Sequence, residues 1–205
     1  MNESAVIENI DEQELPERYQ KPFSVLEDCH RRIEKFLSYC LSICELEDRI
    51  LDTDHQDGLT KALDYFIGAS KLHNADEEES LFPRLRTYGH QEAMAESIKT
   101  IEELEAEHRF VATIHAEYDA LGRAWIESGT LNENDFERFR KLTQELIDIY
   151  TVHISHEDNE IFVAAASVLS SSEVLAIGAE MWERRGRKNC RTRIDSRKQG
   201  KRQSK

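Results

Sequence analysis

Apolar residues recur at every third or fourth position along most of the chain, which is the period of an amphipathic α-helix. Stripes of this kind cover residues 23–44, 63–81, 101–125 and 142–164. They are separated by the polar stretches LDTDHQDG (51–58), YGHQE (88–92) and ESGTLNENDF (127–136). Asp, Asn and Gly in these stretches are typical of helix ends. Because short connections favour antiparallel neighbours, the pattern predicts an all-α fold, an antiparallel up-down-up-down four-helix bundle.

The end of the chain follows a different pattern. The segment SSSEVLAIGAEMW begins with serines that can cap a helix, and it predicts a short C-terminal helix at about residues 172–185. Residues 184–205 hold eleven Lys or Arg and one acidic residue, a net charge of +10, whereas the rest of the chain carries −24. The predicted parts are an acidic N-terminal segment (1–21), the bundle (22–168), the extra helix (169–185) and a basic, disordered tail (186–205).

Each apolar stripe carries a histidine on its apolar face: His30, His73, His108 and His153. In an antiparallel pair of helices, residues equidistant from the connection lie at similar height. The midpoints between successive histidines fall between residues 51 and 52, 90 and 91, and 130 and 131, which are all in the polar stretches. We therefore expect the four imidazoles in one layer of the bundle, where buried side chains of this type need partners.

Two of these histidines have a carboxylate one turn later, because residues i and i+4 share a helix face. The pairs are His73 with Glu77 and His153 with Glu157, in the related stretches HNADEEESLFP and HISHEDNEIFV. Four imidazoles and two carboxylates suit iron, manganese or zinc, and a carboxylate can bridge two cations. One core histidine alone is more often hydrogen-bonded than metal-bound, and an acidic stretch is often a solvated helix face. The common register of all six side chains favours a two-metal site.

Four segments resemble the helices of the hemerythrin HHE cation-binding domain. They are LEDCHRRIEKFL (26–37), HNADEEESLFPRL (73–85), EAEHRFVATI (105–114) and HISHEDNEIF (153–162), and the likeness covers about residues 22–168. The resemblance implies a non-haem di-iron centre, with two iron ions (Fe2+/Fe3+) and a bridging oxo, hydroxo or water ligand. It implies His30, His73, His108 and His153 as terminal ligands and Glu77 and Glu157 as bridges.

The third helix departs from the pattern of the oxygen-carrying members of that family. Those members place a second histidine one turn after the first, and this chain has Ala112 there. His115 lies seven residues after His108, about 10 Å along the helix axis, which is too far to replace it. We expect His115 to lie beside the site or in the core, and we expect a more open coordination than in an oxygen carrier.

The fourth helix offers a choice of carboxylate. The carrier pattern points to Asp158, but we prefer Glu157 because its spacing from His153 repeats that of the earlier pair. Three further side chains are either outer partners of the ligands or surface residues: Glu78, His156 and Glu160.

The favoured function is a hemerythrin-like di-iron protein that binds or senses O2, NO or peroxide. Two alternatives use the same centre: a peroxide-consuming (catalase-like) or oxygen-reducing enzyme, and an iron-storage or iron-centre repair protein. Whether the chain turns over a substrate stays open, and a helical interaction module without metal is a further alternative. The sequence contains no GxGxxG or P-loop motif for a nucleotide cofactor.

Charge and composition narrow the expected partners and location. A body with a charge of −24 argues against nucleic-acid binding by the bundle, whereas the basic tail is either a solubilising end or a contact for an anionic partner. The acidic N-terminus has no apolar signal segment, and no apolar run has the length of a membrane span, so we expect a cytoplasmic protein.

Cys40 and Cys44 are interpreted as small buried residues of a helix rather than a metal or redox pair. No pattern in the sequence indicates an oligomeric state.

Overall fold

The computed structural model describes the backbone of residues 15–200 and the side chains of residues 15–186. Regular structure in this range is entirely helical, with no strand among residues 15–200, so the predicted all-α class is confirmed. Most of the predicted N-terminal segment (1–21) and nearly all of the predicted basic tail (186–205) fall outside the described side chains. None of the described helices combines the length and the hydropathy that a membrane span requires.

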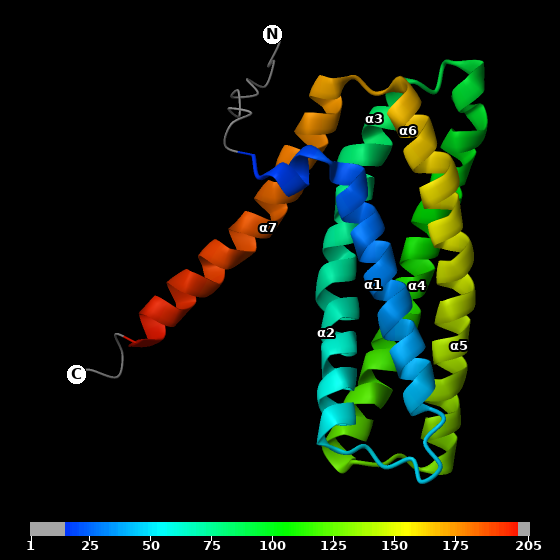
Figure 1. Cartoon of the computed structure of the whole chain (residues 1–205), viewed down its shortest axis with the longest axis vertical. Coiled ribbons are helices and arrows are strands. Elements are labelled where there is room, and N and C mark those ends of the chain that lie inside the picture. Colours follow the sequence, from blue (N-terminus) through cyan, green and yellow to red (C-terminus); the bar gives the residue numbers. More distant parts are fainter. Residues whose placement is uncertain (1–14, 201–205) are drawn as a thin grey trace. The chain divides into compact units, whose positions relative to one another are not determined.

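Four long helices lie alongside one another in Figure 1, and α4 packs against both α2 and α5. They are α1 (Pro22–Ile43), α2 (Thr53–Asp76), α4 (Ala95–Ser128) and α5 (Glu133–His156). This arrangement is compatible with a helical bundle.

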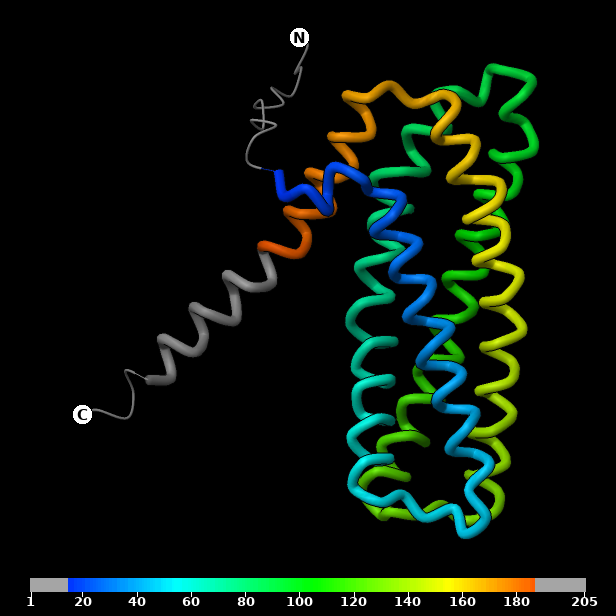
Figure 2. Tube along the Cα trace, viewed as in Figure 1, coloured from blue at the N-terminus to red at the C-terminus, as the bar shows by residue number. Residues whose placement is uncertain are grey.

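Two of the long helices are extended by a wider turn. The π-helical turn η2 (Glu77–Leu81) leads from α2 into α3 (Phe82–Thr87) without a break. In the same way, η4 (Glu157–Ile161) leads from α5 into α6 (Phe162–Val168). The trace in Figure 2 follows these continuous segments, and the short η3 (Glu92–Met94) joins α3 to α4.

The chain forms two compact units, and the larger one is residues 26–169. The other combines the residues up to Val25 with those from Ser170 on, and it contains η1 (Glu17–Gln20) and α7 (Ser171–Gly200). Ser170 and Glu173 form a capping box at the start of α7, as the serine-rich sequence predicts. α7 is longer than the predicted helix of residues 172–185, because the Lys and Arg residues that follow have high helix propensity and no proline interrupts them.

Polar residues of the predicted connections end and begin the helices of the larger unit. The Asp52 carboxylate accepts a hydrogen bond from the His55 N–H (2.8 Å) at the start of α2. The Asn132 side chain accepts one from the Asp135 N–H (3.0 Å) at the start of α5. Gly129 ends α4 in the left-handed region, with φ of 74°. Because α2 begins at Thr53, most of the predicted connection 51–58 is helical.

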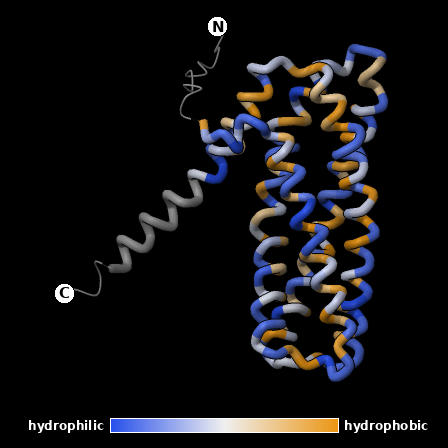
Figure 3. The backbone as a smooth tube through the Cα atoms, viewed as in Figure 1, coloured by the Kyte–Doolittle hydropathy of each residue, from blue (hydrophilic) through white to orange (hydrophobic). Residues whose placement is uncertain are grey.

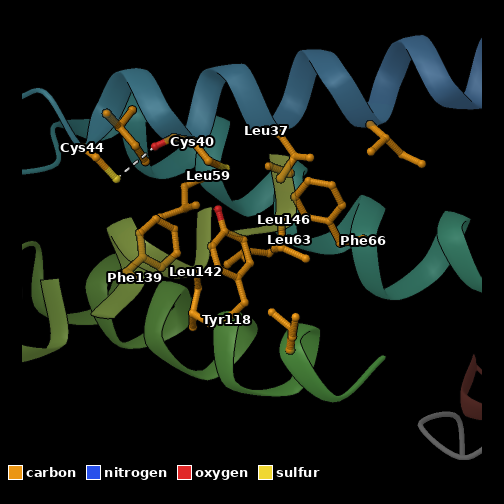
Figure 4. Packing of buried hydrophobic residues seen from close by; sticks show 14 of the residues in the cluster. Leu37, Cys40, Cys44, Leu59, Leu63, Phe66, Tyr118, Phe139, Leu142 and Leu146 are labelled. Carbon is orange, nitrogen blue, oxygen red and sulfur yellow. Dashed lines mark hydrogen bonds between the residues drawn. The ribbon is translucent and has the colours of Figure 1, made fainter. Parts of the chain in front are cut away.

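An apolar core fills the part of the larger unit that lies toward the connections after α1 and α4. Figure 3 shows apolar positions recurring along each helix, and Figure 4 shows how their side chains meet between the helices. The rings of Tyr118 and Phe139 stack with centroids 4.4 Å apart, and Trp125 packs edge-on against Phe139. Burying one such side chain stabilises a fold by about 1.5–3 kcal/mol, so this core can hold polar groups in place beside it.

Candidate metal centre

Four histidines from four helices meet inside the unit of residues 26–169. The Nε2 atoms of His30 (α1) and His73 (α2) lie 3.2 Å apart, and those of His108 (α4) and His153 (α5) lie 3.1 Å apart. Each of the four side chains is buried, with at most 7% of its residue surface exposed. The structure therefore brings together the four histidines that the apolar stripes single out, and it arranges them as two close pairs.

Each of the two glutamates spans both histidine pairs. Glu157 has Oε2 2.9 Å from the His30 Nε2 and Oε1 3.1 Å from the His153 Nε2. Glu77 has Oε1 3.3 Å from the His73 Nε2 and Oε2 3.6 Å from the His108 Nε2. Both carboxylates are fully buried. Each glutamate thus directs one oxygen toward each pair, which is the arrangement that a bridging carboxylate needs.

Potential ligand atoms therefore gather in two neighbouring groups. One consists of His30, His73, Glu77 and Glu157, and the other of His108, His153 and Glu157. Within each group, the donor atoms all lie within 4.8 Å of one another. These six residues are the ones that the sequence selects as metal ligands.

Acidic side chains contact the Nδ1 atoms of three of the histidines. The Nδ1 of His30 lies 2.7 Å from the Asp158 carboxylate, that of His108 lies 2.8 Å from Glu78, and that of His153 lies 2.8 Å from Glu107. A carboxylate in this position accepts the Nδ1–H hydrogen bond. It thereby directs the Nε2 lone pair inward, as the outer partners of metal-binding histidines do.

This arrangement leaves the inward-facing atoms without suitable hydrogen bonds. In the His108–His153 pair both Nδ1 atoms contact a carboxylate, so the two Nε2 atoms, 3.1 Å apart, repel each other unless a proton or a metal ion takes up one of their lone pairs. All four oxygens of Glu77 and Glu157 are buried without a hydrogen-bond partner among the described residues, even though His30 Nε2 lies close to Glu157. A cation in each group would bond these lone pairs, so the donor set fits metal ions.

The pKa values of Glu77 and His153 shift in the direction that reduces the negative charge of the two carboxylates, whereas burial lowers the pKa values of His73 and His108. Burial, followed by the charge of Glu157, raises the pKa of Glu77 well above its ordinary value. Burial alone would lower the pKa of His153, but Glu157 and Glu107 more than offset it and raise that pKa to about 9. Protons can balance the two carboxylates in this way, and metal cations would take the same role.

A π turn begins at each of the two glutamates, in η2 and in η4. Such a turn inserts one extra residue into a helix and is frequent at functional sites. The residues that follow, Phe82 and Phe162, are buried, and the Phe162 ring stacks on His30 with centroids 5.7 Å apart. The two related stretches in the sequence thus form matching structures that continue α2 and α5, and the Phe162 ring covers His30.

The remaining candidates divide into partners of the site and residues away from it. Asp158 and Glu78 contact the Nδ1 atoms of His30 and His108, whereas His156 is partly exposed and pairs with Glu160 (2.8 Å). Glu107 is a partner that the sequence analysis misses. Its position one residue before His108 on α4 does not suggest a contact with His153 on α5, because that contact depends on how the two helices pack.

His115 lies beside the site rather than in it. Its Nε2 is 3.1 Å from the Tyr150 hydroxyl, and its ring packs on Phe66 with centroids 5.2 Å apart. Burial lowers the pKa of His115 to about 4, so the ring is neutral at physiological pH. The prediction of a role beside the site or in the core agrees with these contacts.

Sequence comparisons agree with this geometry. Residues 21–165 match the family described as "Hemerythrin HHE cation binding domain". An uncharacterized protein of Haemophilus influenzae is 27% identical over 175 residues, which are 82% of this chain and 91% of that protein. The match spans all six clustered residues, and their chemistry is that of a metal-binding site. This chain therefore belongs to the hemerythrin HHE cation-binding domain family.

Proposed function

We propose that this chain is a non-haem di-iron protein that binds O2, NO or peroxide at a carboxylate-bridged centre. The proposed ligands are His30 and His73 for one iron, His108 and His153 for the other, and Glu77 and Glu157 as bridges. The proposed domain is residues 22–168, folded as an antiparallel up-down-up-down four-helix bundle. One histidine at a matching height on each of four successive helices supports that order of helices.

The observation that carries the proposal is the position of the two glutamates between the two histidine pairs. Each glutamate has one oxygen within 3.6 Å of a histidine Nε2 in either pair. A single-metal site would not need a second set of imidazoles on the far side of both carboxylates. Two cations joined by two carboxylates account for all eight inward-facing atoms.

The protein side chains leave room for an external ligand at such a centre. Each half supplies two imidazoles and one oxygen from each glutamate, and histidine–carboxylate sites of iron with few protein ligands keep positions open for small molecules. Bound iron would supply one-electron redox chemistry and an open position for a diatomic ligand or peroxide. The chain's own contribution is to orient the imidazoles through Asp158, Glu78 and Glu107, and to exclude water with buried apolar side chains on either side.

The test is anaerobic reconstitution with Fe(II), followed by measurement of bound iron and of optical spectra on adding O2 and then peroxide. We expect two iron ions per chain and a spectral change with either ligand. Steady release of O2 from peroxide would identify the enzymatic alternative. Retention of fewer than one metal ion per chain, or spectra that respond to neither ligand, would refute the proposal.

A further inference from the structure

A cleft opens between α2 and α4 and reaches one side of the candidate metal centre. Its volume is about 240 Å³, and the buried side chains of Phe66, His108, Val111 and Tyr150 are part of its wall. A water molecule occupies about 30 Å³ in the liquid, so the cleft has space for several small molecules. His108 is the one proposed ligand in this wall, which means that the cleft meets the His108–His153 half of the site.

Ala112 lies in the wall of this cleft, one helical turn after His108. It is exposed, and its side chain is a single methyl group. A larger residue at this position would add side-chain volume to the wall of the cleft. The alanine that distinguishes this chain from the oxygen-carrying pattern is therefore one of the small residues that line this side of the centre.

Tyr150 and His115 place a hydrogen-bond donor in the same wall. Their 3.1 Å contact uses one hydrogen, but a neutral imidazole and a phenol together carry two. If the tyrosine donates, the His115 Nδ1–H is left over, and that atom is buried with no partner among the described residues. If the histidine donates from Nε2, the tyrosine O–H is left over. In either case, the pair keeps one hydrogen that its own contact does not use.

The tyrosine also lies next to the proposed ligands. Its ring packs edge-on against the His153 ring, with centroids 6.1 Å apart. A phenol with its ordinary pKa of about 10 is protonated at physiological pH. A small molecule seated in the cleft against His108 would therefore share that wall with the Tyr150–His115 pair, which carries a neutral donor.

We propose that the cleft between α2 and α4 binds a small ligand of two or three heavy atoms at the His108–His153 half, and that the Tyr150–His115 pair donates a hydrogen bond to it. The ligand would carry an oxygen or nitrogen acceptor atom, as diatomic and peroxide-class molecules do. This inference rests on the proposed function, since it takes His108 and His153 as metal ligands.

The experiment uses the full chain loaded with zinc, which undergoes no redox change, and azide as the probe. The dissociation constant of azide is measured by calorimetry, and the 15N resonances of His115 are followed by NMR. The variant Ala112→Phe fills the cleft, and Ala124→Phe, at an exposed alanine further along α4, is its matched control. The double variant Tyr150→Phe, His115→Phe removes both donors, whereas either single variant keeps one.

We expect azide to shift the His115 resonances and to bind about tenfold or more weakly to the double variant, because a hydrogen bond to a charged ligand contributes at least that much to affinity. Ala112→Phe should weaken binding similarly and Ala124→Phe should not. If the double variant does not fold or retain zinc, the test is the NMR measurement on the unaltered protein. A shift of the His115 resonances on adding azide supports the inference, and no shift contradicts it.

Unchanged affinity in the double variant and in Ala112→Phe, with no shift at His115, would overturn this inference. If the protein still bound two zinc ions per chain in that case, only this inference would fail, and the proposed two-metal centre would not be contradicted. Zinc below one ion per chain, without azide binding, would overturn both.

Discussion

At the scale of single residues, two neighbouring glutamates in η4 have different surroundings. Glu157 is fully buried between the histidine pairs, whereas Glu160 is partly exposed and pairs with His156. We predict that Glu157→Gln lowers bound iron from two ions per chain to one or fewer, because an amide is a weaker ligand and carries no charge. Glu160→Gln should retain both ions. Metal analysis of the reconstituted proteins provides the comparison, and equal iron contents in the two variants would count against the bridging role.

Glu107 allows a second comparison, on α4. Its carboxylate contacts the Nδ1 of His153. Glu103, one turn earlier, is 60% exposed and pairs with Lys99 instead. Loss of an outer partner of a metal-binding histidine typically costs 10–100-fold in metal affinity. We expect Glu107→Gln to weaken metal binding by roughly that factor and Glu103→Gln to have no effect. Competition with a chelator of known affinity measures both, and identical affinities would show that His153 does not depend on this carboxylate.

At the scale of helices, two glycines of α2 have opposite surroundings. A Cβ at Gly58 would collide with the Tyr39 hydroxyl, whereas a Cβ at Gly68 would meet no atom of the described residues within 4 Å. Glycine costs about 1 kcal/mol relative to alanine inside a helix. We therefore predict that Gly68→Ala stabilises the fold by up to about 1 kcal/mol and that Gly58→Ala destabilises it.

Urea unfolding of the two glycine variants gives the free energies to compare. Stabilisation by both substitutions would mean that Tyr39 moves aside without cost. Tyr39 also donates a hydrogen bond to the His55 carbonyl (3.1 Å), and a displaced ring would lose that contact.

The glycine at position 58 also illustrates what the sequence can and cannot predict about helices. Apolar periodicity locates the long helices, and the histidine spacing selects the six side chains that cluster. Gly58, however, follows Asp and Gln in LDTDHQDG and suggests a connection, although its actual role is to admit Tyr39 between two helices. That role depends on packing between α1 and α2, which local sequence does not encode.

The π turns and the carboxylates that contact the histidines at Nδ1 could not be predicted from the sequence, for related reasons. One inserted residue at Glu77 or Glu157 falls within the scatter of a 3.6-residue period, so periodicity does not reveal η2 or η4. The outer partners of His30, His108 and His153 depend on how the helices are rotated. For this reason the sequence offered Asp158 as an alternative to Glu157 and Glu78 as an outer or surface residue, and it did not indicate Glu107.

At the scale of the whole molecule, metal ions would join four helices whose ligands lie between residues 30 and 157 of the chain. A ligand that binds only the folded state at 100 times its dissociation constant adds about 2.7 kcal/mol of stability. For a chain of this size we predict that removing the metal lowers the midpoint of thermal unfolding by roughly 5–10 °C. Calorimetry before and after treatment with a chelator tests this. The Glu157→Gln variant should respond less, and an equal shift in that variant would point to metal bound elsewhere.

The acidic side chains that contact His30, His108 and His153 extend from the interior to the solvent. Glu78 and Glu107 are each 39% exposed and Asp158 is 22% exposed, whereas the imidazoles they contact are nearly inaccessible. Arg31, at the protein surface, reaches one of these carboxylates through its own ion pair with Asp158. Substitutions on the outside of the protein, or changes in ionic strength, can therefore adjust how strongly these three imidazoles donate their lone pairs. Affinity at the centre could in this way diverge between relatives while every residue of its interior stays the same.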